Sequence, residues 1–258
     1  MKRLILSNQD IHTGHLILVN RQYPYRENRP AVLAPVGEGG SPVRMDRCAA
    51  ALLSKLMEEI RGWREIAPVS GWRSQQEQQE IWDQSLLDNG LPFTETYVAA
   101  PGHSEHQTGL AIDLGLMSDS IDFIRPDFPY KGICQTFRER CAEYGFVERY
   151  PAGKEDVTGI GHEPWHFRYV GVPHAALMAE GDGTLEEYLA FLRHHPNGEK
   201  PVSYQKNGMD IRISYWKAES GGTTEVEIDP ERPYSLSGDN VGGFILTEWR
   251  GKDDAKAE

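Results

Sequence analysis

Residues 104–114 read SEHQTGLAIDL, and the second half of this stretch alternates between large apolar side chains and small or acidic ones. Successive side chains of a strand point to opposite faces, so Leu110 and Ile112 are expected on the apolar face of a strand. Asp113 would then point away from the main apolar layer. The stretch therefore predicts a strand of a half-buried sheet that carries a carboxylate, with His106 shortly before it.

Helical patterns precede this strand. Apolar residues spaced by three and four follow Asp46, which is placed to cap an amphipathic helix. A short apolar segment at 66–69 then leads to Ser74 and Glu77, whose spacing predicts a capping box at the start of another helix. Arg73 is therefore expected in the turn between a strand and a helix.

The pattern changes near the C-terminus. Up to about residue 193, helical segments alternate with short strands, but after Pro201 the runs DIRISYW, TTEVEID and GGFILTEW show no helical period and are separated by Gly, Pro, Asp and Asn. The sequence therefore predicts an α+β domain over residues 1–198 and a small β-rich appendage over residues 199–258.

Composition narrows the range of functions. The chain has 258 residues, which allows one or two domains, and a formal net charge of -12, which argues against nucleic-acid binding. No run approaches the roughly 18 apolar residues of a membrane span, and the apolar run near the N-terminus is too short for a signal peptide. Three cysteines without a C-x-x-C pair suit a reducing compartment, so we expect a cytoplasmic protein. The oligomeric state stays open.

Two clusters of polar residues carry the chemistry. A catalytic zinc ion takes three protein ligands from His, Asp, Glu or Cys and keeps a further position for water. His106 and Asp113 in the first cluster, together with His166 in the second, provide such a set. Glu163 stands three residues before His166, where a carboxylate is placed to act as a base.

The second cluster also fits a different motif. Residues 162–166 read HEPWH, which matches the H-E-x-x-H of helical zinc proteases. Pro164 lacks a backbone N–H and disfavours helical geometry at Glu163, so a continuous helix through the motif is not expected. A strand or irregular turn fits better, with His166 as a ligand and His162 outside the ligand set.

These residues resemble the zinc D,D-peptidases of the VanX, VanY and VanXY type, which are D-alanyl-D-alanine dipeptidases and carboxypeptidases. The family pattern S-x-H-x-x-G-x-A-x-D is matched by Ser104, His106, Gly109, Ala111 and Asp113. The E-x-W-H segment is matched by Glu163, Trp165 and His166. The G-[YW]-R-S-x-x-x-Q segment is matched by Gly71, Trp72, Arg73, Ser74 and Gln78. The resemblance covers about residues 19–192 and leaves the C-terminal strands outside it.

The resemblance implies a hedgehog/DD-peptidase-like core, with an antiparallel sheet and flanking helices, and a zinc cofactor. It implies that His106, Asp113 and His166 bind the metal and that Glu163 is the catalytic base. It also implies three substrate contacts, namely Arg73, Gln78 and Ser104. The implied reaction is hydrolysis of D-Ala-D-Ala, or removal of the terminal D-Ala from peptidoglycan precursor peptides, in vancomycin-type resistance or cell-wall metabolism. The preference for dipeptidase or carboxypeptidase activity depends on the depth of the substrate pocket, which the sequence leaves open.

Two other classes of protein remain compatible with the ligand set. Two histidines and one aspartate also form the facial triad of non-haem iron oxygenases, but that function leaves Glu163 without a role and does not explain the segment around Arg73. A non-catalytic binding module is the second alternative, since a fold does not fix a function. The presence of Glu163 beside all three ligands argues against it.

Overall fold

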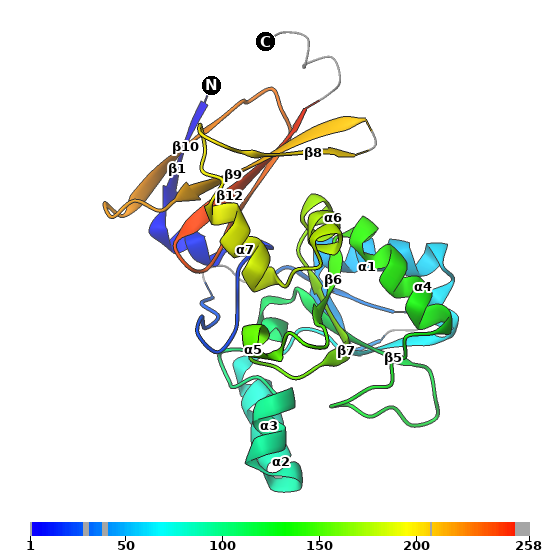
Figure 1. The fold of residues 1–258 in the computed structure, drawn as a ribbon. Helices are drawn as coiled ribbons and strands as arrows, with labels where there is room; N and C mark the ends of the chain where they lie inside the picture. Colours follow the sequence, from blue (N-terminus) through cyan, green and yellow to red (C-terminus); the bar gives the residue numbers. More distant parts are fainter. Residues whose placement is uncertain (1, 28–30, 38–40, 207, 251–258) are drawn as a thin grey trace. The chain divides into compact units, whose positions relative to one another are not determined.

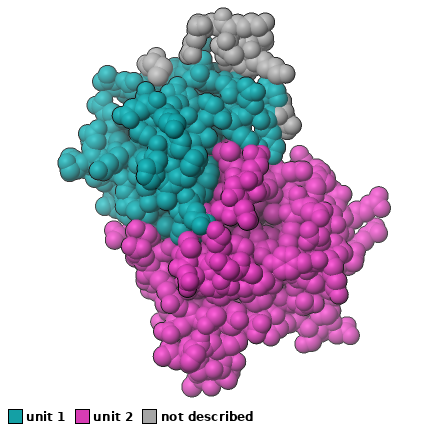
Figure 2. Space-filling model, viewed as in Figure 1, with its two compact units in different colours: residues 1–18, 27–29, 186–258 teal, residues 19–26, 30–185 magenta. Residues whose placement is uncertain are grey.

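The computed structural model describes four ranges of the chain, namely residues 2–27, 31–37, 41–206 and 208–250 (Figure 1). They divide into two compact units, coloured separately in Figure 2. The motifs that contain the candidate site residues all fall in the unit formed by Val19–Arg26 and Pro30–Leu185. The other unit comprises Met1–Leu18, Glu27–Arg29 and Glu186–Glu258.

The unit that carries the motifs is built on a four-stranded antiparallel sheet with strand order β4-β5-β7-β6. Its strands are β4 (Ile66–Ser70), β5 (Ala111–Leu116), β6 (Phe146–Tyr150) and β7 (Glu163–Tyr169). A two-stranded sheet joins β2 (Leu33–Pro35) to β3 (Arg44–Asp46). The strand expected from the SEHQTGLAIDL stretch is therefore confirmed as β5, an inner strand of the sheet.

Among the described residues, six helices and three short 3-10 turns belong to this unit. The helices are α1 (Arg47–Glu59), α2 (Gln75–Asn89), α3 (Leu91–Tyr97), α4 (Gly132–Cys141), α5 (Glu155–Thr158) and α6 (Val172–Gly181). The turns are η2 (Gly62–Arg64), η3 (Glu105–Thr108) and η4 (Ala142–Tyr144). The Asp46 carboxylate caps α1 by accepting from two backbone N–H groups, and Ser74 and Glu77 form the expected capping box on α2.

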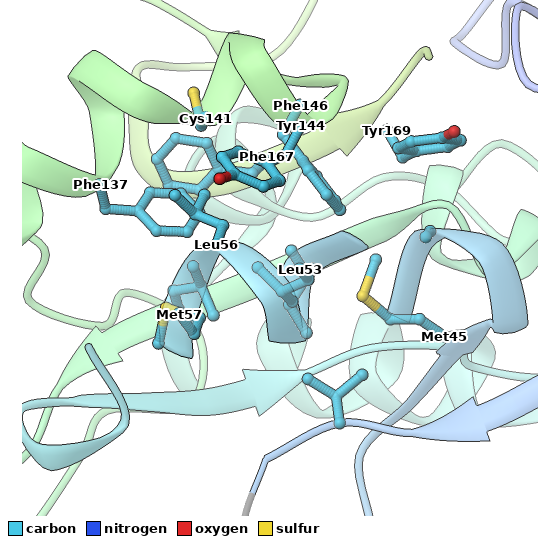
Figure 3. Close-up of a cluster of buried hydrophobic side chains, with 14 of the residues drawn as sticks. Met45, Leu53, Leu56, Met57, Phe137, Cys141, Tyr144, Phe146, Phe167 and Tyr169 are labelled. Carbon is cyan, nitrogen blue, oxygen red and sulfur yellow. The ribbon is translucent and has the colours of Figure 1, made fainter. Parts of the chain in front are cut away.

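The hydrophobic core lies between the sheet and helices α1 and α4. Figure 3 shows Leu53 and Leu56 of α1 close to Phe137 of α4 and Phe167 of β7. The rings of Phe137 and Phe167 meet edge to face, with centroids 4.8 Å apart, a favoured aromatic geometry. Ile112 belongs to the same buried cluster, as its expected position on the apolar face requires. The opposite face of the sheet is thereby left to polar side chains.

The second unit is rich in strands. A four-stranded antiparallel sheet has the order β11-β12-β9-β8, and β1 pairs with β10 in a separate two-stranded sheet. Its elements are β1 (Lys2–Ser7), η1 (Asn8–His12), α7 (Leu185–Arg193), β8 (Val202–Lys206), β9 (Met209–Lys217), β10 (Thr223–Ile228), β11 (Tyr234–Gly238) and β12 (Gly243–Arg250). The three strand-like runs after Pro201 thus become β9, β10 and β12.

The compact units differ from the ranges 1–198 and 199–258 expected from the sequence. Residues 1–18 join the C-terminal strands because β1 pairs with β10 along its whole length, from Lys2 opposite Ile228 to Ser7 opposite Thr223. The segment from Glu186 onward also joins that unit. In the described ranges, each helix is too short or too polar to span a bilayer.

Candidate metal centre

Three side chains from two strands and a turn converge on the polar face of the sheet. Asp113 of β5 and His166 of β7 are direct cross-strand partners, so their side chains leave the sheet on the same side. Asp113 Oδ1 lies 2.9 Å from His166 Nδ1, and Asp113 Oδ2 lies 3.1 Å from His106 Nε2. The potential ligand atoms of the three residues all lie within 4.8 Å of one another, and all three residues are buried.

The turn η3 delivers His106 to this cluster. It ends at Gly109, whose φ of 75° lies in the left-handed region that favours glycine. A Cβ atom at that position would approach the backbone nitrogen of Asp46 to 3.1 Å. His106 Nδ1–H donates to the carbonyl oxygen of Gly71 at 2.6 Å, which leaves Nε2 directed at Asp113. The sharp turn and the backbone contact together fix the orientation of the ring.

Glu163 lies at the start of β7, next to the same cluster. Its carboxylate Oε2 is 3.7 Å from His166 Nδ1, and the residue is only 5% exposed. Burial raises the pKa of Glu163 to about 8, and the nearby charge of Asp113 acts in the same direction. A cation bound in the cluster would oppose that shift and favour the carboxylate. Glu163 is thus a buried carboxyl group beside the three converging side chains.

Burial and charge act differently on the three converging groups. Burial and the positive charge of Arg73 lower the pKa of His106 to about 4. Burial also disfavours the charged form of His166, but the carboxylate of Asp113 outweighs it and the pKa rises to about 9. The two imidazoles hold the pKa of Asp113 well below its usual range despite its burial. A buried carboxylate that faces two imidazole nitrogens is an arrangement that suits a bound cation.

A narrow cavity with a volume of about 40 Å³ opens beside these groups. Three further predicted site residues line it, namely Arg73, Gln78 and Ser104. Within the described part of the chain, neither Arg73 Nε nor Gln78 Oε1 has a hydrogen-bond partner, although both atoms are buried. Gln78 is held in place because its Nε2 donates to the carbonyl oxygen of Ala99 at 2.7 Å. Polar groups that lack partners at a cavity wall favour a polar ligand.

Two other histidines lie outside the cluster. His162 Nε2 is 2.8 Å from the hydroxyl of Tyr130, and the two rings stack with centroids 5.9 Å apart. His103 Nδ1 contacts the carbonyl oxygen of Asn20 at 2.7 Å. The HEPWH stretch is a strand from Glu163 onward, as the proline argument predicted, so its two histidines are not brought together by a helical turn.

The structure also adds residues that sequence reasoning missed. Glu105 packs beside His166, and its carboxylate forms ion pairs with Arg149 of β6 and Arg168 of β7. These arginines hold the pKa of Glu105 well below its usual range although burial acts to raise it. Glu105 stands between two matched positions of the S-x-H pattern, and nothing in the sequence connects it to two arginines more than 40 residues away.

Comparison with known proteins identifies the family. A family model described as VanY, D-alanyl-D-alanine carboxypeptidase, matches residues 43–172. The bifunctional D-Ala-D-Ala dipeptidase and D-Ala-D-Ala carboxypeptidase VanXYC of Enterococcus gallinarum is 40% identical over 181 residues, which cover 69% of this chain and 94% of the relative.

Two solved structures are also similar. The vancomycin resistance D,D-dipeptidase VanXYg, in complex with a D-Ala-D-Ala phosphinate analog, has 46% identity and a TM-score of 0.94, covering 96% of this chain and 99% of its own. A Glu-to-Ala mutant of the vancomycin resistance D,D-pentapeptidase VanY from a VanB-type resistance cassette, in complex with Zn(II), has 34% identity and a TM-score of 0.58. The match covers 68% of this chain and 98% of the VanY chain.

The predicted α+β D,D-peptidase fold is thereby confirmed, and the oxygenase and binding-module alternatives find no support in these similarities. The family match covers both motifs, which strands β5 and β7 bring together in space. The chain belongs to the VanY family of D-alanyl-D-alanine carboxypeptidases.

Proposed function

We propose that this protein hydrolyses the peptide bond before a C-terminal D-alanine, both in free D-Ala-D-Ala and in cell-wall precursor peptides that end in D-Ala-D-Ala. The convergence of Glu163 with His106, Asp113 and His166 at one cavity carries the proposal. It is supported by the relatives, since VanXYC is named for both activities and VanXYg was solved with a D-Ala-D-Ala analog.

We further propose that the cofactor is zinc, held by His106, Asp113 and His166. Two imidazoles and one carboxylate form a donor set typical of a catalytic zinc site. The non-ligating nitrogen of His106 is anchored on a backbone carbonyl, as is usual for a zinc-bound histidine. When bound, zinc would polarise the scissile carbonyl and lower the pKa of a coordinated water towards about 7.

Glu163 is the proposed general base. From its position beside His166 its carboxylate would accept a proton from the attacking water and then pass it to the leaving amine. Burial makes the carboxylate a stronger base, and a bound cation would keep it ionised until it accepts the proton. The reaction needs no covalent intermediate on the protein.

Arg73 is the proposed clamp for the free C-terminal carboxylate of the substrate. A guanidinium can hold a carboxylate through two charge-assisted hydrogen bonds, and the buried Nε of Arg73 lacks a partner within the described ranges. Gln78 Oε1 and the hydroxyl of Ser104 line the same cavity and are proposed as further substrate contacts. These contacts would orient the scissile bond and add no chemistry of their own.

We also propose a cytoplasmic location, because soluble precursor peptides that end in D-Ala-D-Ala are made there. The cysteines support it, because all three lie within the described ranges and are free thiols. Removal of D-Ala-D-Ala from the precursor pool would reduce the target of vancomycin-type antibiotics. We therefore propose a role in resistance, which is supported by the similarity to VanXYg, a vancomycin resistance D,D-dipeptidase.

The test is D-alanine release by the zinc-loaded protein from D-Ala-D-Ala and from a pentapeptide that ends in D-Ala-D-Ala. We expect release from both substrates, abolished by a chelator and restored by added zinc. The ratio between the two substrates ranks dipeptidase against carboxypeptidase activity. A zinc-loaded protein that released D-alanine from neither substrate would refute the proposed function.

A further inference from the structure

A buried cluster of three charged residues lies behind His166 and takes no part in the proposed reaction. The side chains of Glu105, Arg149 and Arg168 are all 0% exposed. Arg149 Nε lies 2.8 Å from Glu105 Oε1, and Arg168 Nη1 lies 2.9 Å from the same oxygen. Both arginines thus approach one oxygen of the carboxylate and leave the other for a different partner.

That other oxygen faces a metal-ligand candidate. Glu105 Oε2 lies 3.6 Å from Nε2 of His166, on the side of the ring away from Asp113. Among the described residues, neither Glu105 Oε2 nor His166 Nε2 has a hydrogen-bond partner, although both atoms are buried. Buried polar atoms rarely lack partners, so two such atoms that face each other point to one hydrogen bond between them.

We infer that Glu105 is a positioning residue, which accepts a hydrogen bond from His166 Nε2–H and so directs Nδ1 of that ring at the metal site. The inference rests on the proposed zinc site. A carboxylate acceptor fixes the tautomer that carries its proton on Nε2, and Nδ1 then keeps a free lone pair for a metal ion. The ion pairs with Arg149 and Arg168 hold the Glu105 carboxylate in position beside the imidazole ring of His166.

The position of Glu105 in the fold gives this contact a second effect. Glu105 and His106 are neighbours in η3, so one short turn supplies a proposed ligand and the group that orients another. His166 and Arg168 share one face of β7. Any shift of η3 would therefore disturb both histidines together, which couples the two halves of the metal site.

A purely structural role for the cluster is the competing explanation. A buried ion pair contributes little net stability, because the cost of removing the charges from water offsets their attraction. A structural role alone does not explain why the second oxygen points at an imidazole nitrogen.

Glu105→Gln separates the two roles. Because both arginines only donate hydrogen bonds, the amide oxygen of Gln would face them and its NH₂ group would face His166 Nε2. That arrangement favours the tautomer with its proton on Nδ1, where the metal ion should bind. We expect zinc affinity, measured by competition with a chelator, to fall by about 10- to 100-fold, and the visible spectrum of the cobalt-substituted protein to change.

Glu148→Gln is the matched control. Glu148 lies on β6 beside Arg149 and pairs with Arg138 at 2.7 Å, but its side chain has no contact with the three proposed ligands among the described interactions. Loss of this ion pair should lower the melting temperature of the metal-free protein while zinc affinity and the cobalt spectrum stay as in the wild type. Glu105→Asp, which keeps the charge, should retain more zinc affinity than Glu105→Gln.

Should Glu105→Gln not fold, the double variant Glu105→Gln with Arg149→Met replaces it, because it restores the wild-type net charge of the cluster. If the folded variant keeps the zinc affinity and the cobalt spectrum of the wild type, the inference is overturned. This holds even if the wild-type enzyme releases D-alanine. Weakened zinc binding in the variant, with no D-alanine release by the wild type, would support the inference while the proposed function fails.

Discussion

Glu163 and His166 are three residues apart in the chain, and Glu163 Oε2 lies 3.7 Å from His166 Nδ1. The proposed mechanism nevertheless gives the two residues different tasks. His166 would hold the metal ion and Glu163 would move the proton. Substitutions of the two residues should therefore affect different measured quantities. The same holds for Arg73, which is proposed to bind substrate without taking part in proton transfer.

Removal of the Glu163 carboxylate should reduce turnover and spare the metal. We expect Glu163→Ala to retain zinc and to lose on the order of 10²-fold or more in kcat, the usual contribution of a general base. Zinc content by atomic absorption and steady-state kinetics check the two parts. Turnover near that of the wild type would exclude Glu163 as the base.

Removal of the Arg73 guanidinium should affect recognition of the substrate's carboxylate. Wild type should prefer a free-acid substrate over its C-terminal amide, and Arg73→Ala should lose most of that preference, on the order of 10-fold or more for a pair of charge-assisted hydrogen bonds. The measurement is kcat/KM on both substrates. Arg73→Lys is the control, because it keeps the positive charge but lacks the paired N–H donors of the guanidinium. An unchanged preference in Arg73→Ala would contradict the clamp.

Cys141 should make stability depend on alkaline pH. Burial raises the pKa of its thiol to about 12, from an ordinary value of 9.0. The folded state therefore holds its proton more tightly than the unfolded state, so this contribution to stability is complete below pH 9 and is lost as pH rises towards 12. Denaturant unfolding between pH 8 and 11 should show a shallower decline for Cys141→Ala than for wild type. A decline in Cys141→Ala as steep as that of the wild type would contradict the prediction.

At the scale of elements, the site depends on strand register and on two short connections. The pairing of Asp113 with His166 puts two ligands side by side, and a slip of one residue between β5 and β7 would send one of them to the apolar face. The connection from β4 to α2 positions Arg73, and η3 positions His106. Strands β4, β5 and β7 contribute to the buried core cluster the side chains of Ile66, Ile112 and Phe167.

The cap of α2 gives an element-scale prediction. The Ser74 hydroxyl accepts from Glu77 N at 3.1 Å, and Ser74 N donates to Glu77 Oε2 at 2.7 Å, one residue after Arg73. Ser74→Ala should lower the free energy of unfolding by about 1 kcal/mol, as for other N-caps, and should raise KM more than it lowers kcat. Urea titration and kinetics test both effects. Ser118→Ala, at an exposed serine, should change neither.

For the whole molecule, the two compact units should respond differently to the metal. A ligand that binds only the folded state stabilises it by about 2.7 kcal/mol at 100 times its Kd. Zinc should therefore raise the melting temperature, and it should slow hydrogen exchange in β5 and β7 far more than in β9 and β12. Exchange mass spectrometry with and without a chelator provides the measurement. Equal protection of both units would contradict a zinc site confined to the unit of residues 30–185.

Local sequence patterns predicted individual elements and identified the residues of the candidate site. Capping residues at Asp46 and Ser74 predicted the starts of α1 and α2, and Pro164 predicted a strand where a helical motif was conceivable, because these effects act within a few residues. The three proposed ligands and Glu163 were named from spacing and from the family resemblance. Their roles remain proposals, but their convergence is observed.

The long-range pairings could be identified only from the folded chain. The grouping of residues 1–18 with the C-terminal strands depends on the pairing of β1 with β10, more than 200 residues apart, and no local pattern encodes such a partner. The contact of Glu105 with Arg149, Arg168 and His166 is of the same kind. Charged residues in a sequence look solvated by default, and burial becomes visible only when the packed sheet removes water from them.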